Sequence, residues 1–486
     1  MDITRQIGGF GDNPEALMKA MTAGQISGRE TTNLSLTGEP LKLESLERTV
    51  KLLEFRKKQI VLLNNFPKKL ANSTVEEFVQ LESYGEDRGG FYDEGELSDV
   101  EDSTYIRRAE FVKYIQVTGE VTVQAQMTKN LLDVYKNEVK NKTMWVMRKM
   151  NSALTKADSS IIPQEFNGIY KQHASIGSDF IYSNLEEYYN SNVVIDMRGE
   201  PLTQADIVDA SDIIYENNGD VDSLFGSPSV ISGLAKDYFS QQRIMMQTSN
   251  TGFRGGIGTV PKAIDTQWGD VSLMADKFLA TDPPLTTADS ASSPKAPNAP
   301  QAVQSDPVAL ESDGQSKFTS DDAGDVFYAV AALNKYGRSP LTVLDSTKVT
   351  LAEGSSVDLG FTGGGGQTPP TGFEIYRSKP TSATDPSGIQ FFPLFKVSKK
   401  ELDNGYDGGE SGVVRDRGRI MPGTEQAFTT AMNEEVLCYK QLAPIFKLDL
   451  SVQSMSRRFI IANFGTPQLY APRKMVKFIN IGRYKA

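Results

Sequence analysis

Hydrophobic residues recur with a helical period between 127 and about 157. Steps of three and four residues, with one double step, separate Leu132, Tyr135, Val139, Val146, Met150 and Leu154. This spacing predicts one apolar stripe along a helix of about eight turns, or about 40 Å. Lys and Asn fill the other face, while Trp145 and Met147 widen the stripe. We expect the stripe to pack in a core.

Helical signals also run from 12 to 80. Asn13 and Pro14 form an N-cap and first-turn pair, and "LESLERTVKLLEFRKKQIVLLNNF" combines mixed charge with apolar periodicity. Ser73 and Glu76 in "STVE" fit a capping box, which indicates a further helix start. Residues 1–82 are therefore predicted to form an N-terminal arm with helices.

Between 83 and 126 the pattern changes. The first part is rich in Gly, Asp and Glu and short of apolar residues, which favours an exposed extended loop. The second part, "FVKYIQVTGEVTV", is β-branched and aromatic, which predicts a strand or a bent pair of strands. The acids from Glu94 to Asp102 could suggest calcium. They lack the D-x-D-x-D-G order of a calcium loop, so a solvated or partner-facing loop is favoured.

Short strands and helices alternate from 160 to 280. "VVIDMRG" is strand-like, one helix is capped by Thr203, and another begins at Ser227 and Pro228. The glycines in "RGGIGTVPK" are not followed by Gly-Lys-Ser/Thr, so they favour a bend over a phosphate-binding loop. With the long helix, 127–280 is predicted to be an α+β body.

The composition shifts abruptly at Thr281. "TDPPLTTADSASSPKAPNAPQAVQSDP" is typical of a semi-rigid extended linker. Strand-like runs at the spacing of a β-sandwich follow, and Asn334 and Gly337 supply the turn chemistry between two of them. We assign 281–440 to the linker and an inserted sandwich, in which "DNGYDGGES" favours a surface turn over a calcium site. Strand-like segments resume in 441–486 and are expected to complete the body.

Three segments of the insertion resemble fibronectin type III or immunoglobulin-like modules. They are "SPKAPNAPQAVQ", "VFYAVAALNKYGRSPLT" and "GFEIYRSK", and the resemblance covers Ser293 to Arg419. It implies an all-β sandwich. It says almost nothing about function.

Composition narrows the chemistry. A chain of 486 residues is longer than one hydrophobic core usually serves, so more than one structural unit is expected. The net charge of −11 argues against a protein whose whole surface binds nucleic acid, although local basic patches remain possible. The one cysteine, Cys438, allows no intrachain disulfide and is expected to be buried. Because His173 is the one histidine, a Ser-His-Asp triad or a multi-histidine zinc site is nearly excluded, and we expect His173 at the surface or in a loop. We expect no metal, no cofactor and no membrane span.

The order of the segments outside the insertion resembles the major capsid proteins of tailed bacteriophages. The segments are "LKLESLERTVKLL", "FNGIYKQ", "VDSLFGSPSVISGLAKDYF", "GTVPKAIDTQWGDVSLMADKFL" and "RRFIIANFGTPQLYAPRKMVKFINI". Each is short and degenerate, so their order carries the resemblance. It implies the capsid shell (Johnson) fold, with an N-terminal arm, an extended loop, a long spine helix, and peripheral and axial regions, plus an immunoglobulin-like insertion.

The resemblance also implies a function. The chain would be a non-enzymatic subunit that self-assembles, as hexamers and pentamers, into the icosahedral head shell of a phage in the host bacterial cytoplasm. Packaged double-stranded DNA would lie inside, and portal, scaffold and cement proteins are candidate partners.

A shell subunit needs broad interfaces, which arms that cross neighbouring copies provide. We therefore expect inter-subunit contacts at Arg88, Phe91, Tyr92, Glu94, Glu96, Tyr105, Arg107, Arg108, Arg457 and Arg458. The lysine–asparagine cross-link of the family cannot be carried over, because Glu82 to Tyr105 contains no lysine. We expect noncovalent shells.

Residues 450–486 contain seven Lys or Arg and no acid. One interpretation is an inner surface that touches packaged DNA through its phosphates. The favoured interpretation is complementarity to the acidic arm of a neighbour, over Glu82 to Asp102.

Two other classes stay open. A phage or bacterial surface or fibre protein that uses the sandwich for adhesion would explain the insertion, but not the long helix or the body that resumes after it. A carbohydrate-active enzyme would need paired carboxylates in a distinctive motif, and no acid here stands in one.

Overall fold

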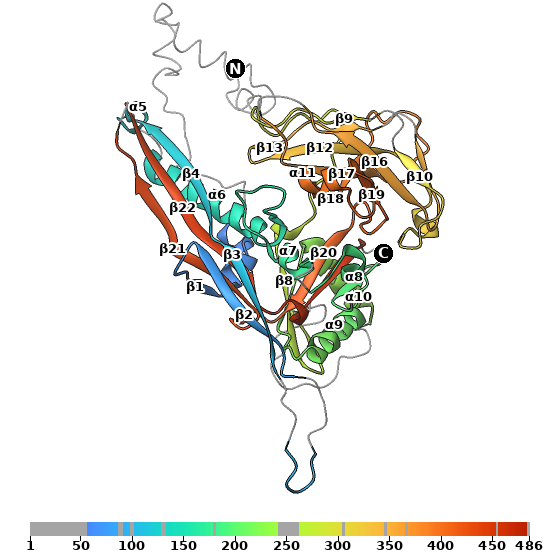
Figure 1. Cartoon of the computed structure of the whole chain (residues 1–486). Coiled ribbons are helices and arrows are strands. Elements are labelled where there is room, and N and C mark those ends of the chain that lie inside the picture. The colour runs from blue at the N-terminus through green and yellow to red at the C-terminus, as the bar shows by residue number, and fades with distance from the viewer. Residues whose placement is uncertain are drawn as a thin grey trace, which may run out of the picture. The chain divides into compact units, whose positions relative to one another are not determined.

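The computed structural model describes residues 56–85, 91–97, 102–127, 133–177, 181–241, 262–303, 307–344, 348–364, 368–452 and 455–483. The elements named below belong to one compact unit, Phe55–Thr128 with Val134–Ala486. Two mixed sheets form its body, and further strands form the insertion (Figure 1).

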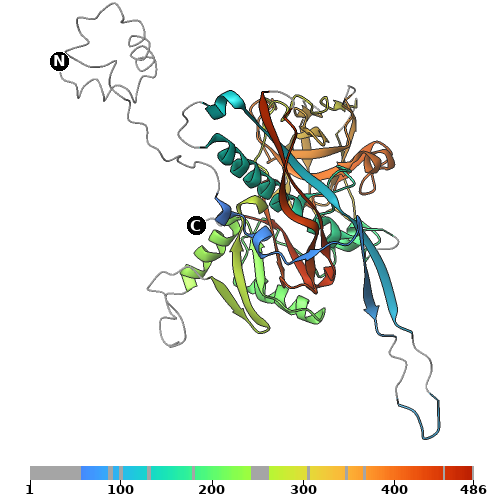
Figure 2. The ribbon, with the colours of Figure 1, turned by 90° about the vertical axis from the view of Figure 1, so that its left-hand side faces the viewer.

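A four-stranded sheet joins the beginning and the end of the described chain. Its order is β1 (Lys68–Leu70), β21 (Leu437–Asp449), β22 (Ser456–Leu469) and β4 (Lys113–Thr122). β1 runs parallel to β21, and the other pairs are antiparallel. The long helix α6 (Val134–Lys156) packs along one face of this sheet (Figures 1 and 2).

The apolar stripe of α6 confirms the helical period. Val146, Met150 and Leu154 are buried between the helix and the sheet. The helix begins at Val134, later than predicted, and the short helix α5 (Val123–Met127) precedes it in the chain. Leu132 lies outside the described residues.

Trp145 does not widen the stripe, so that prediction is wrong. Its side chain is 37% exposed. Each residue turns a helix by about 100°, which places Trp145 beyond the edge of a stripe centred on Val146 and Met150. Met147, by contrast, packs against the core as predicted.

Close packing between the sheet and α6 depends on Gly119. β4 pairs with β22 so that Gly119 faces Phe459, and a Cβ at 119 would lie 2.3 Å from Cζ of that ring. The Phe459 ring is fully buried and meets Tyr135 of α6 edge-on, with 5.3 Å between ring centroids. A side chain at 119 would therefore push this ring out of the core.

Strands β2 (Val75–Ser83) and β3 (Thr104–Phe111) form an antiparallel hairpin. We call this hairpin, with the segment 91–97, the arm. The prediction of a helix start at Ser73 is wrong. The Glu76 carboxylate does accept hydrogen bonds from the backbone N–H groups of Asn72 and Ser73, of 2.7 and 2.9 Å. A strand follows, because Val75, Phe78 and Val79 favour extended backbone and β2 pairs with β3 from Val75 to Ser83.

The segment before β1 contains the 3-10 helix η3 (Lys57–Gln59) and the short helix α4 (Leu62–Asn65). The helical signals predicted in 12–55 lie outside the described residues. Buried Asp276 fixes this segment to α6. Its carboxylate accepts hydrogen bonds from the backbone of Leu62, at 2.9 Å, and from the Asn151 amide, at 2.8 Å.

The second body sheet has six strands. Their order is β5 (Val194–Asp196), β23 (Met475–Ile481), β20 (Glu425–Thr430), β6 (Ser223–Gly226), β8 (Gly269–Ala275) and β7 (Ala263–Thr266). Helices α9 (Gln204–Glu216) and α10 (Pro228–Gln241) bury apolar side chains against it. Thr203 caps α9 and Pro228 opens α10, as the sequence predicts. Short helices η5 (Lys277–Leu279) and η7 (Pro472–Lys474) lie at strand ends.

His173 is fully buried, so the prediction of a surface position is wrong. It lies on α7 (Ile169–Ala174), and α8 (Leu185–Tyr189) supplies Tyr188 beside it. The ring Nε2 is 2.9 Å from the Met475 carbonyl and donates to it, while Nδ1 is 3.0 Å from the Tyr188 hydroxyl. Burial lowers the pKa of His173 to about 4, so the ring is neutral. Cys438 is buried, as predicted.

The insertion consists of antiparallel strands with two buried apolar clusters, a large one and a smaller one around Phe327 and Phe391. One sheet contains β13 (Gly337–Arg338), β12 (Tyr328–Asn334), β17 (Gly372–Ser378) and β18 (Phe391–Ser398), with β14 (Thr342–Val343) beside β12. The other strands are β9 (Gln301–Ala302), β10 (Val308–Leu310), β11 (Gly324–Val326), β15 (Val349–Leu351), β16 (Ser356–Thr362) and β19 (Val413–Asp416). Val330, Leu359 and Ile375 are fully buried between these layers. The immunoglobulin-like assignment stays a prediction.

Two short helices complete the insertion, η6 (Ser320–Asp322) and α11 (Lys399–Asn404). The turn predicted after β12 is present, because Asn334 Oδ1 accepts hydrogen bonds from the backbone of Tyr336 and Gly337. The preceding linker is extended but not detached. Leu285 and Phe391 exchange two backbone hydrogen bonds, of 2.7 and 2.9 Å, so the linker lies along the insertion.

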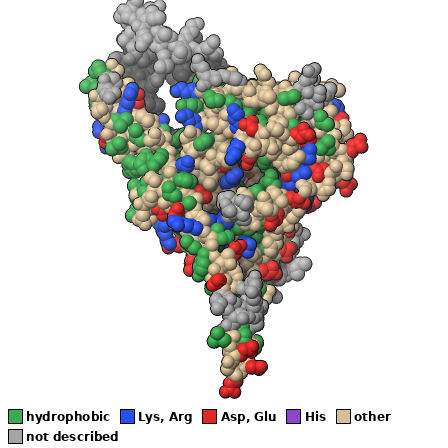
Figure 3. Space-filling view, viewed as in Figure 1, with side chains coloured by type: hydrophobic (Ala, Val, Ile, Leu, Met, Phe, Trp, Pro, Cys, Tyr) green, Lys and Arg blue, Asp and Glu red, His purple; other side chains and the backbone are tan. Residues whose placement is uncertain are grey.

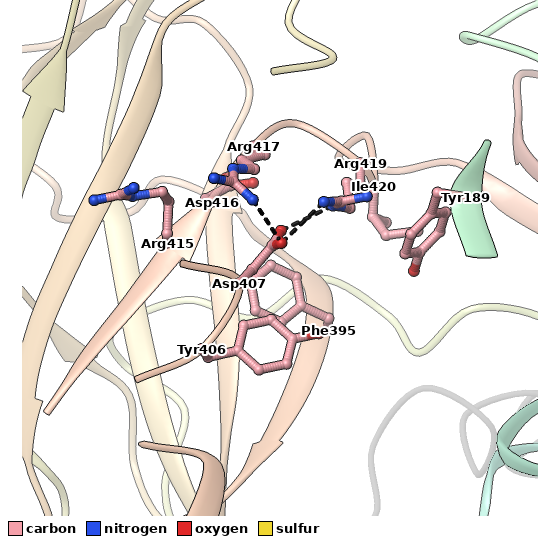
Figure 4. A pocket seen from close by; sticks show the side chains of 9 residues that line it. All are labelled: Tyr189, Phe395, Tyr406, Asp407, Arg415, Asp416, Arg417, Arg419 and Ile420. Carbon is pink, nitrogen blue, oxygen red and sulfur yellow. Dashed lines mark hydrogen bonds and ion pairs between the residues drawn. The ribbon is translucent and has the colours of Figure 1, made fainter. Parts of the chain in front are cut away.

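A buried ionic cluster fixes the insertion to the body (Figure 4). Asp407 accepts from Arg417, at 2.9 Å, and from Arg419, at 2.8 and 2.9 Å. The Arg419 guanidinium lies over the ring of Tyr189 of the body, 5.1 Å from its centroid. Asn480 of β23 donates to the Arg419 carbonyl. The prediction of a plain surface turn for "DNGYDGGES" is therefore wrong at Asp407, because two arginines neutralise its buried charge.

Candidate assembly surfaces

The arm presents an outward stripe of apolar and charged side chains. Strand pairing sets Val79 opposite Arg107 and Leu81 opposite Tyr105, with Phe111 nearer the body. Directly opposite residues of antiparallel strands point to the same side. The side chains of Val79 and Tyr105 are 62% and 64% exposed. We call Val79, Leu81, Tyr105 and Phe111 the arm face.

The body holds the other side of the arm's base. Phe78 meets Tyr470 edge-on, with 5.0 Å between ring centroids, and Gln80 donates to the Tyr470 carbonyl. Arg108 donates to the Ser175 hydroxyl at 3.1 Å. These contacts fix the base of the arm while its outward stripe stays in water.

Glu110 lies on the same inner side, directly opposite Glu76. The Asn167 amide donates to its carboxylate at 3.2 Å. Burial raises the pKa of Glu110 to about 7, and the Asn167 hydrogen bond and the charges of Arg108 and Lys113 reduce that rise. Near neutral pH this carboxyl is therefore partly protonated.

The four-stranded sheet has an exposed apolar surface on the side away from α6. Tyr114 of β4 is paired with Phe464 of β22, with 4.9 Å between ring centroids, and Phe446 of β21 lies 5.2 Å from Phe464. Leu448 continues the row. We call Tyr114, Phe446, Leu448 and Phe464 the sheet face. Figure 3 shows hydrophobic side chains gathered on this part of the molecule.

Exposed hydrophobic residues are concentrated on the arm and this sheet. Of nineteen large exposed hydrophobic side chains among the described residues, eleven lie between Leu70 and Met127. Leu448, Val452 and Met455 add three near the β21–β22 turn. Exposed apolar patches rimmed by polar groups mark contacts with other proteins.

The structure places the predicted contact residues of the loop in water. Phe91, Tyr92, Glu94 and Glu96 are all exposed in 91–97. Arg88 lies outside the described residues.

The remaining predicted contact residues lie in three different places. Tyr105 and Arg107 lie on the outward side of the arm, where Arg107 pairs with Glu77, whereas Arg108 lies on the inner side. Arg457 and Arg458 lie together at one end of β22, with Arg457 over the Tyr135 ring and Arg458 3.2 Å from Glu120. The residues that sequence reasoning missed are Val79, Leu81, Phe111, Tyr114, Phe446, Leu448 and Phe464.

The basic residues of 450–486 do not form one patch in the described part of the chain. Lys477 is buried over the Tyr170 ring, 4.2 Å from its centroid, and burial lowers its pKa to about 8. Arg473 lies 3.8 Å from Glu82. Neither the DNA nor the neighbour interpretation of this segment is tested by these positions.

In the ranges that the structure describes, no group of three or more His, Cys, Asp or Glu is placed to hold a metal ion. No helix in those ranges is long and apolar enough to cross a membrane. The distinctive surfaces are the arm face and the sheet face, and both suit contact with another protein.

Comparison with known proteins agrees with this. Residues 31–295, more than half of the chain, match the SU10 major capsid protein family. The chain belongs to that family. The major capsid protein of Staphylococcus phage K is 20% identical to this capsid protein over 461 residues, which are 94% of this chain and 93% of the relative.

Solved capsids are similar at lower identity. The capsid of a native GTA particle shows 7% identity and a TM-score of 0.45, covering 92% of this chain and 98% of that chain. The capsid of Cyanophage P-SCSP1u shows 7% identity and a TM-score of 0.44, covering 91% and 93%.

The predicted function and capsid shell fold are confirmed. This is a major capsid protein of a tailed phage, a structural component of the virion whose copies form the head shell. The family match ends at residue 295, close to Ser293, where the insertion was predicted to begin.

Proposed function

We propose that this capsid protein assembles noncovalently through the arm face and the sheet face. Its copies form hexamers and pentamers, which close into a shell around double-stranded DNA. Assembly takes place in the host cytoplasm, with portal, scaffold and cement proteins as further partners, and the subunit catalyses no reaction. The observation that carries the proposal is the apolar arm face, held in water on strands whose base is fixed to the body.

The energetics support this arrangement. Burying apolar surface yields about 25 cal/mol per Å², so covering exposed tyrosine, phenylalanine and leucine side chains stabilises a contact between copies. Each such contact can be weak, because every subunit of a closed shell makes it several times and multivalency raises the overall stability.

A charge placed on the arm face tests the proposal. We expect Val79→Asp to prevent shell formation, because a carboxylate would have to lose its water between copies, and its cationic neighbour across the strands, Arg107, already pairs with Glu77. The matched control is Tyr336→Asp, which puts the same charge at a 45% exposed aromatic position of the insertion. Electron microscopy and sedimentation of the purified proteins measure the outcome. Shells from Val79→Asp as abundant as those from the control would sink the proposal.

An adhesive surface or fibre protein is not favoured. The family match covers the arm, the long helix and most of the body, and it ends where the insertion begins. The fibre interpretation rests on the insertion alone, whereas the family match lies almost entirely before it.

A further inference from the structure

The segment 158–168, which joins α6 to α7, contacts both the base of the arm and the insertion (Figure 1). We call it the connector. It is closed at its ends, because the backbone N–H of Gly168 donates to the Ala157 carbonyl at 2.8 Å. Within this closure, Asn167 Oδ1 accepts hydrogen bonds from the backbone and the hydroxyl of Ser159, of 3.2 and 2.7 Å. The connector is therefore a compact, internally bonded piece.

The base of the arm and the start of β4 are bonded to the connector. The Asn167 amide donates to the Glu110 carboxylate of β3 at 3.2 Å. The Lys113 ammonium of β4 donates to the Pro163 carbonyl at 2.7 Å. Phe166 is buried in a small apolar cluster beside β4. A displacement of β3 and β4 must therefore move the connector or break these contacts.

The insertion meets the connector at Ile161. This side chain is 5% exposed and lies against Gly372 of β17, where an added Cβ would be 2.6 Å from Ile161 Cγ2. Two carboxylates of the connector also lie near enough to Lys396 of β18 to raise its pKa, although Glu374 of the insertion is the largest cause. They are Asp158 and Glu165.

Hydrogen bonds make up much of the remaining boundary between the insertion and the body. Arg198 Nη1 donates to the Gly418 carbonyl at 2.9 Å, and the Lys317 ammonium donates to Asn190 Oδ1 at 2.7 Å. Two parts of one chain that meet through such polar contacts can move relative to each other, unlike parts joined by a large hydrophobic interface. The insertion is thus able to respond to a change at Ile161.

We propose that the connector couples the arm to the insertion, so that a change at the base of the arm changes how firmly the insertion is held. One compact piece makes both sets of contacts, and close-packed groups transmit a displacement that a loose loop would absorb. When another copy covers the arm face, the insertion of the first copy responds. That use of the coupling rests on the proposed function, whereas the coupling itself lies within one chain.

Hydrogen exchange of unassembled full-length subunits, followed by mass spectrometry, tests the coupling from the arm side. We expect Glu110→Ala with Lys113→Ala to make the amides of β17 and β18 exchange about threefold faster. The matched control is Glu77→Ala with Arg107→Ala, which removes an acid and a base that pair on the outward side of the arm. It should leave β17 and β18 unchanged. Strand β6, in the other body sheet, is the internal reference for general destabilisation.

The same coupling must act in the reverse direction, because a coupling free energy between two sites is reciprocal. We expect Ile161→Ala to make the amides of β2 and β3 exchange faster. Ile207→Ala is the control, since it removes the same side chain from a fully buried position in the core of the six-stranded sheet. It should leave the arm unchanged. Circular dichroism verifies folding, and Lys113→Ala alone is the milder arm-side variant if the double variant does not fold.

Equal exchange of β17 and β18 in the two arm variants would overturn the proposal. An arm that exchanges as fast in Ile207→Ala as in Ile161→Ala would also overturn it. Failure of the proposed function gives a different result. Shells would then form from Val79→Asp as abundantly as from its control, while unassembled subunits still showed the coupling.

Discussion

The buried imidazole of His173 is held in its neutral form by its surroundings. His173 shares its surroundings with the Tyr188 hydroxyl and the Met475 carbonyl, both of which suit an uncharged imidazole. Nearby Lys477 also lowers the pKa of His173, although burial is the larger cause. Burial and the positive charge of Lys477 therefore both disfavour a protonated ring.

This predicts an acid-sensitive contribution to stability. The folded pKa of His173, about 4, lies below its ordinary value of 6.5. The unfolded chain therefore binds more protons between these values, and the free energy of unfolding falls by up to roughly 3 kcal/mol as pH drops from about 6.5 to about 4. Above about 6.5 this group has no effect. We expect His173→Gln to reduce the pH dependence, measured by urea unfolding at several pH values. Equal slopes for both proteins would contradict this.

The sequence could not place His173 or Trp145 correctly. "YKQHASIG" is a polar segment, which suggests the surface. The partners that allow His173 to be buried, Tyr188 and Met475, lie 15 and 302 residues further along the chain. Whether a polar side chain is paired in a core depends on tertiary contacts that local composition does not show.

At the scale of the elements, packing between the four-stranded sheet and α6 requires β4 and the Phe459 ring of β22 to lie in close contact. At Gly119 there is no room for a Cβ, because the Phe459 ring occupies the position. Overpacking of this kind costs about 1–3 kcal/mol, since either the ring or the strand must move. We expect Gly119→Ala to lower the free energy of unfolding by that amount. Denaturant unfolding measures it.

The control for this prediction is Gly314→Ala in the insertion, where nothing lies within 4 Å of the added Cβ. It should leave stability nearly unchanged. A similar loss in both variants would show that the loss does not come from the Phe459 contact.

Helices with regularly spaced apolar residues or clear capping residues could be predicted from the sequence, whereas the strands of the arm could be predicted only in part. The stripe of α6 and the starts of α9 and α10 follow from local spacing and capping. β2 was missed because "STVE" imitates a helix start, and only pairing with β3 shows the strand. The arm face was missed for the same reason, since which side of a strand stays exposed depends on what covers the other side.

At the scale of the whole molecule, the insertion has apolar clusters of its own, which contact the body only at their edge, for example at Tyr189. Neither the core around α6 nor the core of the six-stranded sheet contains a buried residue from 283–422. The chain enters and leaves the insertion at adjacent points, because the Thr281 hydroxyl donates to the Thr424 carbonyl at 2.9 Å. The insertion is thus removable in principle.

We expect deletion of 283–422, with the ends joined by a short glycine–serine linker, to leave the body folded. The unfolding temperature should fall by a few degrees, because Asn480 loses its hydrogen bonds to Met421 and Arg419 and Tyr189 is uncovered. Circular dichroism with thermal unfolding measures this. Aggregation of the deletion variant would show that the insertion belongs to the structural core.

The position of the last strands has a consequence for how the protein is made. β22 lies between β21 and β4, and β23 lies between β5 and β20, so each body sheet has an inner strand from the end of the chain, within Ser456–Ile481. A ribosome delivers these strands last, whereas the strands of the insertion are complete by Asp416. The insertion can therefore fold on the nascent chain before the strands that complete the body sheets have been synthesised. A chain that ends before β21 lacks the strands that carry most of the sheet face, so we expect incomplete copies to be left out of the head.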